Sequence, residues 1–133
     1  RRVAQALDAN RLAMLIAVLQ RRGRIGIGPR DVYASVAGGV RVAETGADLA
    51  ILLALASAVN DTPVAADTVA LGEVGLGGEI RQAAQAPRRL AEALRLGFRR
   101  AIVPPSTPDL RGLDLVRVDD VHDALAAAGV SGG

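Results

Sequence analysis

The sequence predicts a single α/β domain built on a mixed sheet. Strand-like and helix-like segments alternate along its second half, which is typical of helices packed on a sheet. Half of the residues are apolar, yet Tyr33 and Phe98 are the only aromatic ones, so the core must be aliphatic. The 133 residues contain neither a repeat nor a long linker, and this length is typical of one domain. We therefore expect one domain over residues 1–130 and a flexible Gly/Ser tail over residues 131–133.

The first predicted helix lies between Asp8 and Gly23. Four apolar residues have the i, i+3, i+4, i+7 spacing of an amphipathic helix: Leu12, Leu15, Ile16 and Leu19. Asp8 is the expected N-cap, and Gly23 is the expected stop. Two β-branched runs follow, over residues 32–36 and 40–43, with Gly38-Gly39 between them. They predict two strands joined in a hairpin.

The remaining elements are predicted from apolar patterns and from glycine and proline positions. Residues 48–61 are apolar on nearly every side, which is typical of a helix buried inside a domain. Residues 67–82 read as a strand, a glycine turn and a returning strand. A helix is expected to start at Pro87 and to end before Gly97. The last three predicted elements are strands over 99–103 and 113–118 and a capped helix over 119–129.

The composition excludes several classes of function. The chain has no cysteine, so disulfides, thiolate metal sites and a cysteine nucleophile are excluded. His122 is the only histidine, and its charged surroundings predict a surface position rather than a metal site or a catalytic triad. The sequence opens with no signal segment, and its longest apolar run is too short to cross a bilayer. We therefore expect a cytoplasmic protein without a membrane partner.

Four glycines crowd the stretch from Leu71 to Gln82. A Walker loop would need a lysine, and a dinucleotide fingerprint would need G-x-G-x-x-G between a strand and a helix; neither occurs. Glu73 and Glu79 flank the glycines and would repel phosphate. We therefore interpret this stretch as a structural hairpin whose glycines accept positive φ, and we expect no cofactor site and no metal site in this chain.

All 16 basic residues are arginine, and they fall largely into two clusters. The first consists of Arg21, Arg22 and Arg24; the second consists of Arg88, Arg89, Arg95, Arg99 and Arg100. Such clusters can contact phosphates, although a solvated charged face is the commoner explanation. Glu92 has the helical spacing for an ion pair with Arg88 or Arg95.

Four segments of the chain, taken in order, resemble the C-terminal domain of the bacterial RadA (Sms) family of DNA repair proteins. They are residues 10–23, 31–57, 71–82 and 89–105. The resemblance implies a fold like the proteolytic domain of Lon. It also implies a longer protein with an N-terminal zinc finger and a RecA-like ATPase that forms a hexameric ring and promotes branch migration. ATP, magnesium and zinc would belong to those further domains, and this chain would hold none of them.

The resemblance also locates two positions where Lon-type peptidases carry catalytic groups. The serine nucleophile corresponds to Gly46, and the lysine base corresponds to Pro87. No serine lies between residues 44 and 48, and the chain has no lysine at all. Arginine cannot act as the base, because its pKa above about 12 keeps it protonated. We therefore expect no enzymatic activity from this chain.

Three hypotheses about function follow. In the first, the domain helps to assemble a homo-oligomeric, hexameric ring and contacts single- or double-stranded DNA independently of sequence. The candidate DNA-binding residues are Arg21, Arg22, Arg24, Arg88, Arg89, Arg99 and Arg100. In the second, the domain is a purely structural oligomerisation module without DNA contact. In the third, it is a residual hydrolase that uses another nucleophile, such as Ser35 or Ser57.

Overall fold

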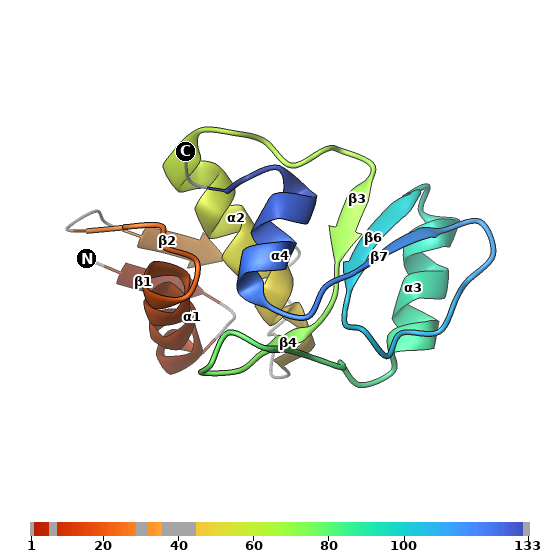
Figure 1. Ribbon diagram of the computed structural model, residues 1–133, viewed down its shortest axis with the longest axis horizontal. Helices are drawn as coiled ribbons and strands as arrows, with labels where there is room; N and C mark the ends of the chain where they lie inside the picture. The colour runs from red at the N-terminus through yellow and green to blue at the C-terminus, as the bar shows by residue number, and fades with distance from the viewer. Residues whose placement is uncertain (1, 6–7, 29–31, 36–44, 132–133) are drawn as a thin grey trace.

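The computed structural model describes residues 2–5, 8–28, 32–35 and 45–131 as a mixed α/β domain (Figure 1). The elements of the first half are β1 (Arg2–Gln5), α1 (Ala9–Arg21), β2 (Val32–Ser35), the 3-10 turn η1 (Thr45–Ala47) and α2 (Asp48–Asn60). Those of the second half are β3 (Thr68–Ala70), β4 (Glu73–Val74), β5 (Ile80–Arg81), α3 (Ala86–Arg95), β6 (Arg100–Val103), β7 (Asp114–Arg117) and α4 (Val121–Ala128). The predicted α/β class is confirmed.

The strands form three small sheets. β3, β6 and β7 form a parallel sheet in that order, with Ala70 opposite Ile102 and Ile102 opposite Val116. β4 and β5 form an antiparallel hairpin, and β1 and β2 form a parallel pair. The predicted strand over residues 32–36 is confirmed as β2, but its partner among the described residues is β1, which the sequence did not predict. The second strand of that predicted hairpin, over residues 40–43, lies outside the described residues, as does Gly38-Gly39.

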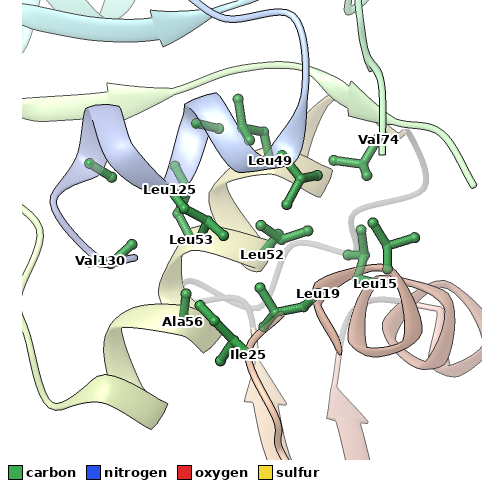
Figure 2. Close-up of a cluster of buried hydrophobic side chains, with 14 of the residues drawn as sticks. Leu15, Leu19, Ile25, Leu49, Leu52, Leu53, Ala56, Val74, Leu125 and Val130 are labelled. Atoms are coloured by element: carbon green, nitrogen blue, oxygen red, sulfur yellow. The ribbon is translucent and has the colours of Figure 1, made fainter. Parts of the chain in front are cut away.

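Two hydrophobic clusters lie on opposite faces of the three-stranded sheet. Side chains alternate along β6, so Ile102 packs with α1, α2 and α4 whereas Ala101 and Val103 pack with α3. Figure 2 shows the larger cluster, in which leucines of α1 and α2 meet Leu125 and Val130. Dense aliphatic packing of this kind is the main source of stability in a domain that has few aromatic residues.

Helix α2 is less completely buried than its sequence predicted. Leu49, Leu52, Leu53 and Ala56 are buried, but the opposite side of the helix exposes alanines 50, 54 and 58. The sequence pattern could not distinguish these two sides, because alanine and leucine are both apolar. The small alanine side chains leave an exposed helix face without charges.

The helix ends follow the predicted capping rules. The Asp8 carboxylate accepts a hydrogen bond from the Asn10 amide at 2.8 Å, and Pro87 lies in the first turn of α3. Asp120 caps α4 in the same way as Asp8 caps α1, and α4 ends at Gly129, which has a left-handed φ of 73°. These contacts satisfy backbone groups that a helix end leaves unpaired.

The C-terminal segment is anchored as far as Val130. This residue is fully buried, and its carbonyl accepts a hydrogen bond from the Asn60 side chain at 2.8 Å. Residues 132–133 of the predicted tail lie outside the described residues. Among the helices of the described ranges, none is both long and apolar enough to cross a membrane.

Candidate functional site

The glycine-rich stretch forms the predicted hairpin between β4 and β5. The Gly78 amide donates to the Gly75 carbonyl at 2.9 Å, and the Gly75 amide donates to the Glu79 carbonyl at 2.9 Å. Of its four glycines, only Gly78 has a positive φ, of +85°. Gly75 has no positive φ. Its lack of a side chain instead leaves room for the Glu79 carboxylate, one oxygen of which would lie 1.7 Å from a Cβ at this position. The structural interpretation of this stretch is confirmed, but positive φ explains one glycine only.

Position 46, where the resemblance places the nucleophile of Lon-type peptidases, is covered by an arginine. Gly46 is buried in η1, and a Cβ on it would lie 2.4 Å from Nη1 of Arg89 and 3.1 Å from Cβ of Ala83. Pro87, at the position of the lysine base, is exposed on the first turn of α3. The fold therefore brings α3 to position 46, but the side chain that reaches it is Arg89, two residues beyond Pro87.

An ion pair with a buried carboxylate lies two residues further along the chain from Gly46. Asp48 is 1% exposed, and both of its carboxylate oxygens bind the guanidinium of the partly buried Arg11, with 2.9 Å between Arg11 Nε and Asp48 Oδ1. Asp48 also accepts the Val74 amide at 3.0 Å. The hydrogen bond to Asp48 is the main cause that raises the pKa of Arg11 above its ordinary value. The pair connects α1, α2 and β4.

The other charges beside the hairpin are also paired. Arg81 Nη2 lies 2.6 Å from Glu79 Oε1, and Arg81 Nη1 lies 3.8 Å from Glu73. Glu73 also accepts a hydrogen bond from the Thr45 hydroxyl. The pKa of Glu79 is lowered, chiefly by its own backbone amide and then by Arg81. A depression of about 380 Å³ lies between these residues. The positively and negatively charged side chains that line it pair with partners inside the chain.

The first arginine cluster lies at the C-terminal end of α1. Arg21, Arg22 and Arg24 are all exposed. Arg24 has a left-handed φ of 56°, and the aliphatic part of Arg22 lies against Gly78, since a Cβ on Gly78 would be 3.0 Å from Arg22 Cβ. None of the three forms an ion pair with another described residue.

The second arginine cluster is less uniform than its sequence suggested. Arg88 is exposed and forms no ion pair with a described residue, whereas Arg95 binds Glu92 through two hydrogen bonds of 2.9 and 2.5 Å. The partner of Glu92 is therefore Arg95. Arg99 is exposed and donates to the adjacent carbonyl of Phe98. Arg88 and Arg99 are thus the exposed members of this cluster that form no ion pair with another described residue.

Arg100 is half-buried, because its guanidinium donates to the Ala127 carbonyl of α4 at 2.8 Å. Arg111 is a further exposed arginine that we did not single out from the sequence. It precedes Gly112, where a Cβ would lie 3.3 Å from Leu94 of α3. Helix α3 lies at the opposite end of the molecule from α1 (Figure 1).

The remaining chemical candidates have structural partners. The Ser57 hydroxyl donates to the Thr62 carbonyl at 2.7 Å, at the end of α2, and Ser35 is the last residue of β2. His122 is exposed, as predicted, and lies 3.7 Å from Asp123. Asp120, His122 and Asp123 form a group of potential metal ligands, but the Asp120 carboxylate already caps α4 through the Asp123 amide.

Comparisons with known proteins show the family to which this chain belongs. Residues 34–107 match the model of the family described as subunit ChlI of Mg-chelatase, and the chain belongs to that family. Over nearly its whole length it is similar to the bacterial DNA repair protein RadA, which confirms the resemblance inferred from the sequence. It is 47% identical to RadA of Escherichia coli over 95% of this chain and 28% of that protein.

Two further relatives are also RadA proteins. RadA of Mycolicibacterium smegmatis is 44% identical over 94% of this chain and 27% of its own length. RadA of Bacillus subtilis is 40% identical over 94% of this chain and 28% of its own length. The chain therefore spans less than a third of the length of these curated relatives.

Proposed function

We propose that the chain is a non-catalytic, Lon-protease-like domain of a RadA-type DNA repair protein. In this proposal it contacts DNA through its α3 end and helps to assemble a homo-oligomeric ring. The observation that carries the proposal is the placement of Arg89 over Gly46 in a chain that matches RadA over 95% of its length. A guanidinium group thus lies beside the position that would hold the nucleophile, and a guanidinium cannot act as the base.

Two physical arguments support the absence of peptidase chemistry. Gly46 carries no nucleophile, and the chain has no lysine. An arginine guanidinium is not deprotonated in proteins, so Arg89 offers no general base in place of the lysine. The Ser57 hydroxyl is bound to the Thr62 carbonyl, which gives it no proton acceptor of the kind that activates a nucleophile.

The proposed DNA contact rests on the charge of the α3 end. Arg88, Arg99 and Arg111 are exposed there, and Glu92 is neutralised by Arg95. Guanidinium groups bind phosphate through paired hydrogen bonds and release counterions from DNA, so such contacts are independent of sequence and weaken with salt. Arg89 and Arg100 are poorer candidates, since their side chains pack on Gly46 and bind Ala127 respectively. ATP hydrolysis and branch migration would belong to the rest of the longer protein.

DNA binding across a salt series tests this proposal. Fluorescence anisotropy with labelled single- and double-stranded oligonucleotides should show that Arg88→Ala plus Arg99→Ala lowers the salt slope by about 2, about one unit for each lost phosphate contact. Arg81→Ala is the matched control, because Arg81 is exposed but paired with Glu79. Equal affinity and slope in the α3 variant and the native chain would contradict the proposed surface.

The same measurements separate the alternatives. They should be repeated in the full-length protein, because ring avidity multiplies weak contacts, and sedimentation should be run in parallel. A ring that forms without any salt-dependent DNA binding by this domain would favour the purely structural module. Stoichiometric labelling of the folded chain by a serine-reactive phosphonate would favour the residual hydrolase.

A further inference from the structure

A groove lies between the last turns of α1 and the tip of the β4–β5 hairpin. Its volume is about 680 Å³, and it is lined by Ala17, Val18, Gln20, Arg21 and Leu76. Leu76 is 76% exposed, which is more than any other large apolar side chain in the described part of the molecule. An exposed leucine beside apolar helix positions marks a surface on which a ligand could bury apolar area.

The groove has a rigid wall. The hairpin tip that carries Leu76 is closed by the Gly78-to-Gly75 hydrogen bond of 2.9 Å, and the Gly78 carbonyl accepts the Val121 amide of α4 at 2.8 Å. Arg22 of α1 packs against Gly78 from the other side. Leu76 is therefore held away from the core by backbone contacts on both sides of the turn. A preorganised apolar contact of this kind costs little entropy when a ligand binds.

One end of the groove is strongly basic. Arg21 lines it, and Arg22 and Arg24 follow at the same end of α1, without an ion pair to another described residue. Two of the carboxylates that the fold brings to the hairpin are engaged elsewhere, because Glu79 binds Arg81 and Asp120 caps α4. The groove thus combines an uncovered leucine with a positive rim.

We propose that this groove docks an acidic segment of a partner protein in which carboxylates adjoin an aliphatic or aromatic side chain. The carboxylates would bind the guanidinium groups of Arg21 and its neighbours, since charge-assisted pairs with arginine are the strong ones. The apolar side chain would cover Leu76 and Ala17. A nucleic-acid backbone would interact only with the basic part of this surface, because phosphates would neutralise the arginines but leave Leu76 exposed to water.

Peptide binding to the 133-residue chain tests the proposal. The probe is a fluorescein-labelled peptide with three aspartates followed by leucine and phenylalanine, and binding is read by anisotropy. Leu76→Ser should weaken binding about tenfold or more, as expected from the loss of one buried leucine contact. Arg21→Glu should weaken it at low salt more than at high salt. Leu96→Ser is the matched control, because Leu96 is also an exposed leucine, 61% accessible, on a different surface.

Control ligands determine which chemistry the groove selects. A peptide with serines in place of leucine and phenylalanine should bind much more weakly, and so should one with asparagines in place of the aspartates. Equal binding of the acidic and the serine-substituted peptides would overturn the proposal, as would equal effects of Leu76→Ser and Leu96→Ser.

Two other occupants would also overturn the proposal. If Leu76→Ser leaves peptide binding intact but lowers the oligomeric state, the groove is covered by a second copy of the chain. If Arg21→Glu abolishes DNA binding while no peptide binds, the cluster is a nucleic-acid surface. Circular dichroism melting should confirm that the variants stay folded. The salt-slope test on Arg88 and Arg99 concerns the opposite end of the molecule, so the two proposals can fail independently.

Discussion

The side chain of Arg22 lies flat against the backbone of Gly78. A Cβ at position 78 would be 3.0 Å from Arg22 Cβ and 3.1 Å from Arg22 Cγ, and the φ of Gly78 is +85°. One glycine therefore satisfies two requirements at once, a left-handed turn and a close approach of α1.

Gly78→Ala should accordingly destabilise the domain. We expect a loss of about 1–2 kcal/mol in the free energy of unfolding, the usual cost of placing a side chain in the left-handed region. The matched control is Gly77→Ala, where the new Cβ would meet only the end of the flexible Glu79 side chain at 2.7 Å. Urea denaturation measures both values, and equal losses would contradict the geometric explanation.

The pair of Arg11 and Asp48 should be far more important for stability than the surface pairs. Asp48→Asn should cost about 1–3 kcal/mol, because the guanidinium of Arg11, whose side chain is 30% exposed, loses its charge-assisted hydrogen bonds to a buried carboxylate. The exposed pair of Glu92 and Arg95 provides the control, and Glu92→Gln should leave the unfolding midpoint unchanged. Equal effects of the two substitutions would show that the Asp48 pair contributes no more than a surface pair.

The Glu79 carboxyl should titrate below the ordinary glutamate pKa of 4.5. Because its pKa is lower in the folded chain than in the unfolded one, its contribution to stability is present above the unfolded pKa and is lost as pH falls through the folded pKa. NMR titration should show this lowered value. Arg81→Ala should raise the pKa only part of the way, since the largest cause is the backbone amide of Glu79 itself. Complete restoration would assign the shift to Arg81 alone.

The C-terminal anchor should also be measurable. Val130 is fully buried and follows α4 through Gly129, so Val130→Ala should cost about 1–2 kcal/mol through the loss of buried methyl groups. Ser131→Ala, at the next and exposed position, should have no effect. Thermal or urea unfolding of the two variants checks the difference, and identical curves would show that the segment after α4 contributes nothing.

Introducing a serine at position 46 should damage the fold rather than create catalysis. Gly46→Ser should cost about 1 kcal/mol by overpacking, because its Cβ would lie 3.1 Å from the Cβ of Ala83, which cannot swing aside, and the end of the Arg89 side chain would have to turn away from its present place. The double variant with Arg89→Ala should be less destabilised than the sum of the single losses, which is the signature of direct contact. Additive losses in the free energy of unfolding, measured by urea denaturation, would show that Arg89 moves aside at no cost to stability.

The helices were largely predictable because their signals are local. The leucine spacing of α1, its Asp8 cap and Pro87 at the start of α3 each depend on neighbours within a few residues. The strand β1 was missed because its partner is β2, on the far side of α1, and a four-residue parallel strand has no pattern of its own. The exposed alanines of α2 show the limit of hydropathy, which does not indicate where an apolar helix meets solvent.

The sequence alone shows which catalytic residues the candidate site lacks, but it does not show which side chains come into contact there. The absence of lysine and the identity of Gly46 are read directly from the sequence. The contact between Arg89 and Gly46, the burial of Asp48 and the internal use of Arg100 all depend on tertiary packing between segments far apart in the chain. Arginines that looked equivalent in the sequence therefore separate into structural and exposed groups.

The contact between α3 and η1 also bears on what a single substitution could achieve at position 46. A serine there would meet Ala83 and the end of Arg89, and position 87 would still hold a proline in a chain without lysine. Three separate changes would therefore be needed to bring a hydroxyl and a lysine together at this place: a new side chain at position 46, a displaced Arg89 and a lysine in place of the proline at the start of α3. Substitutions on the exposed surfaces can accumulate without bringing any of these changes closer.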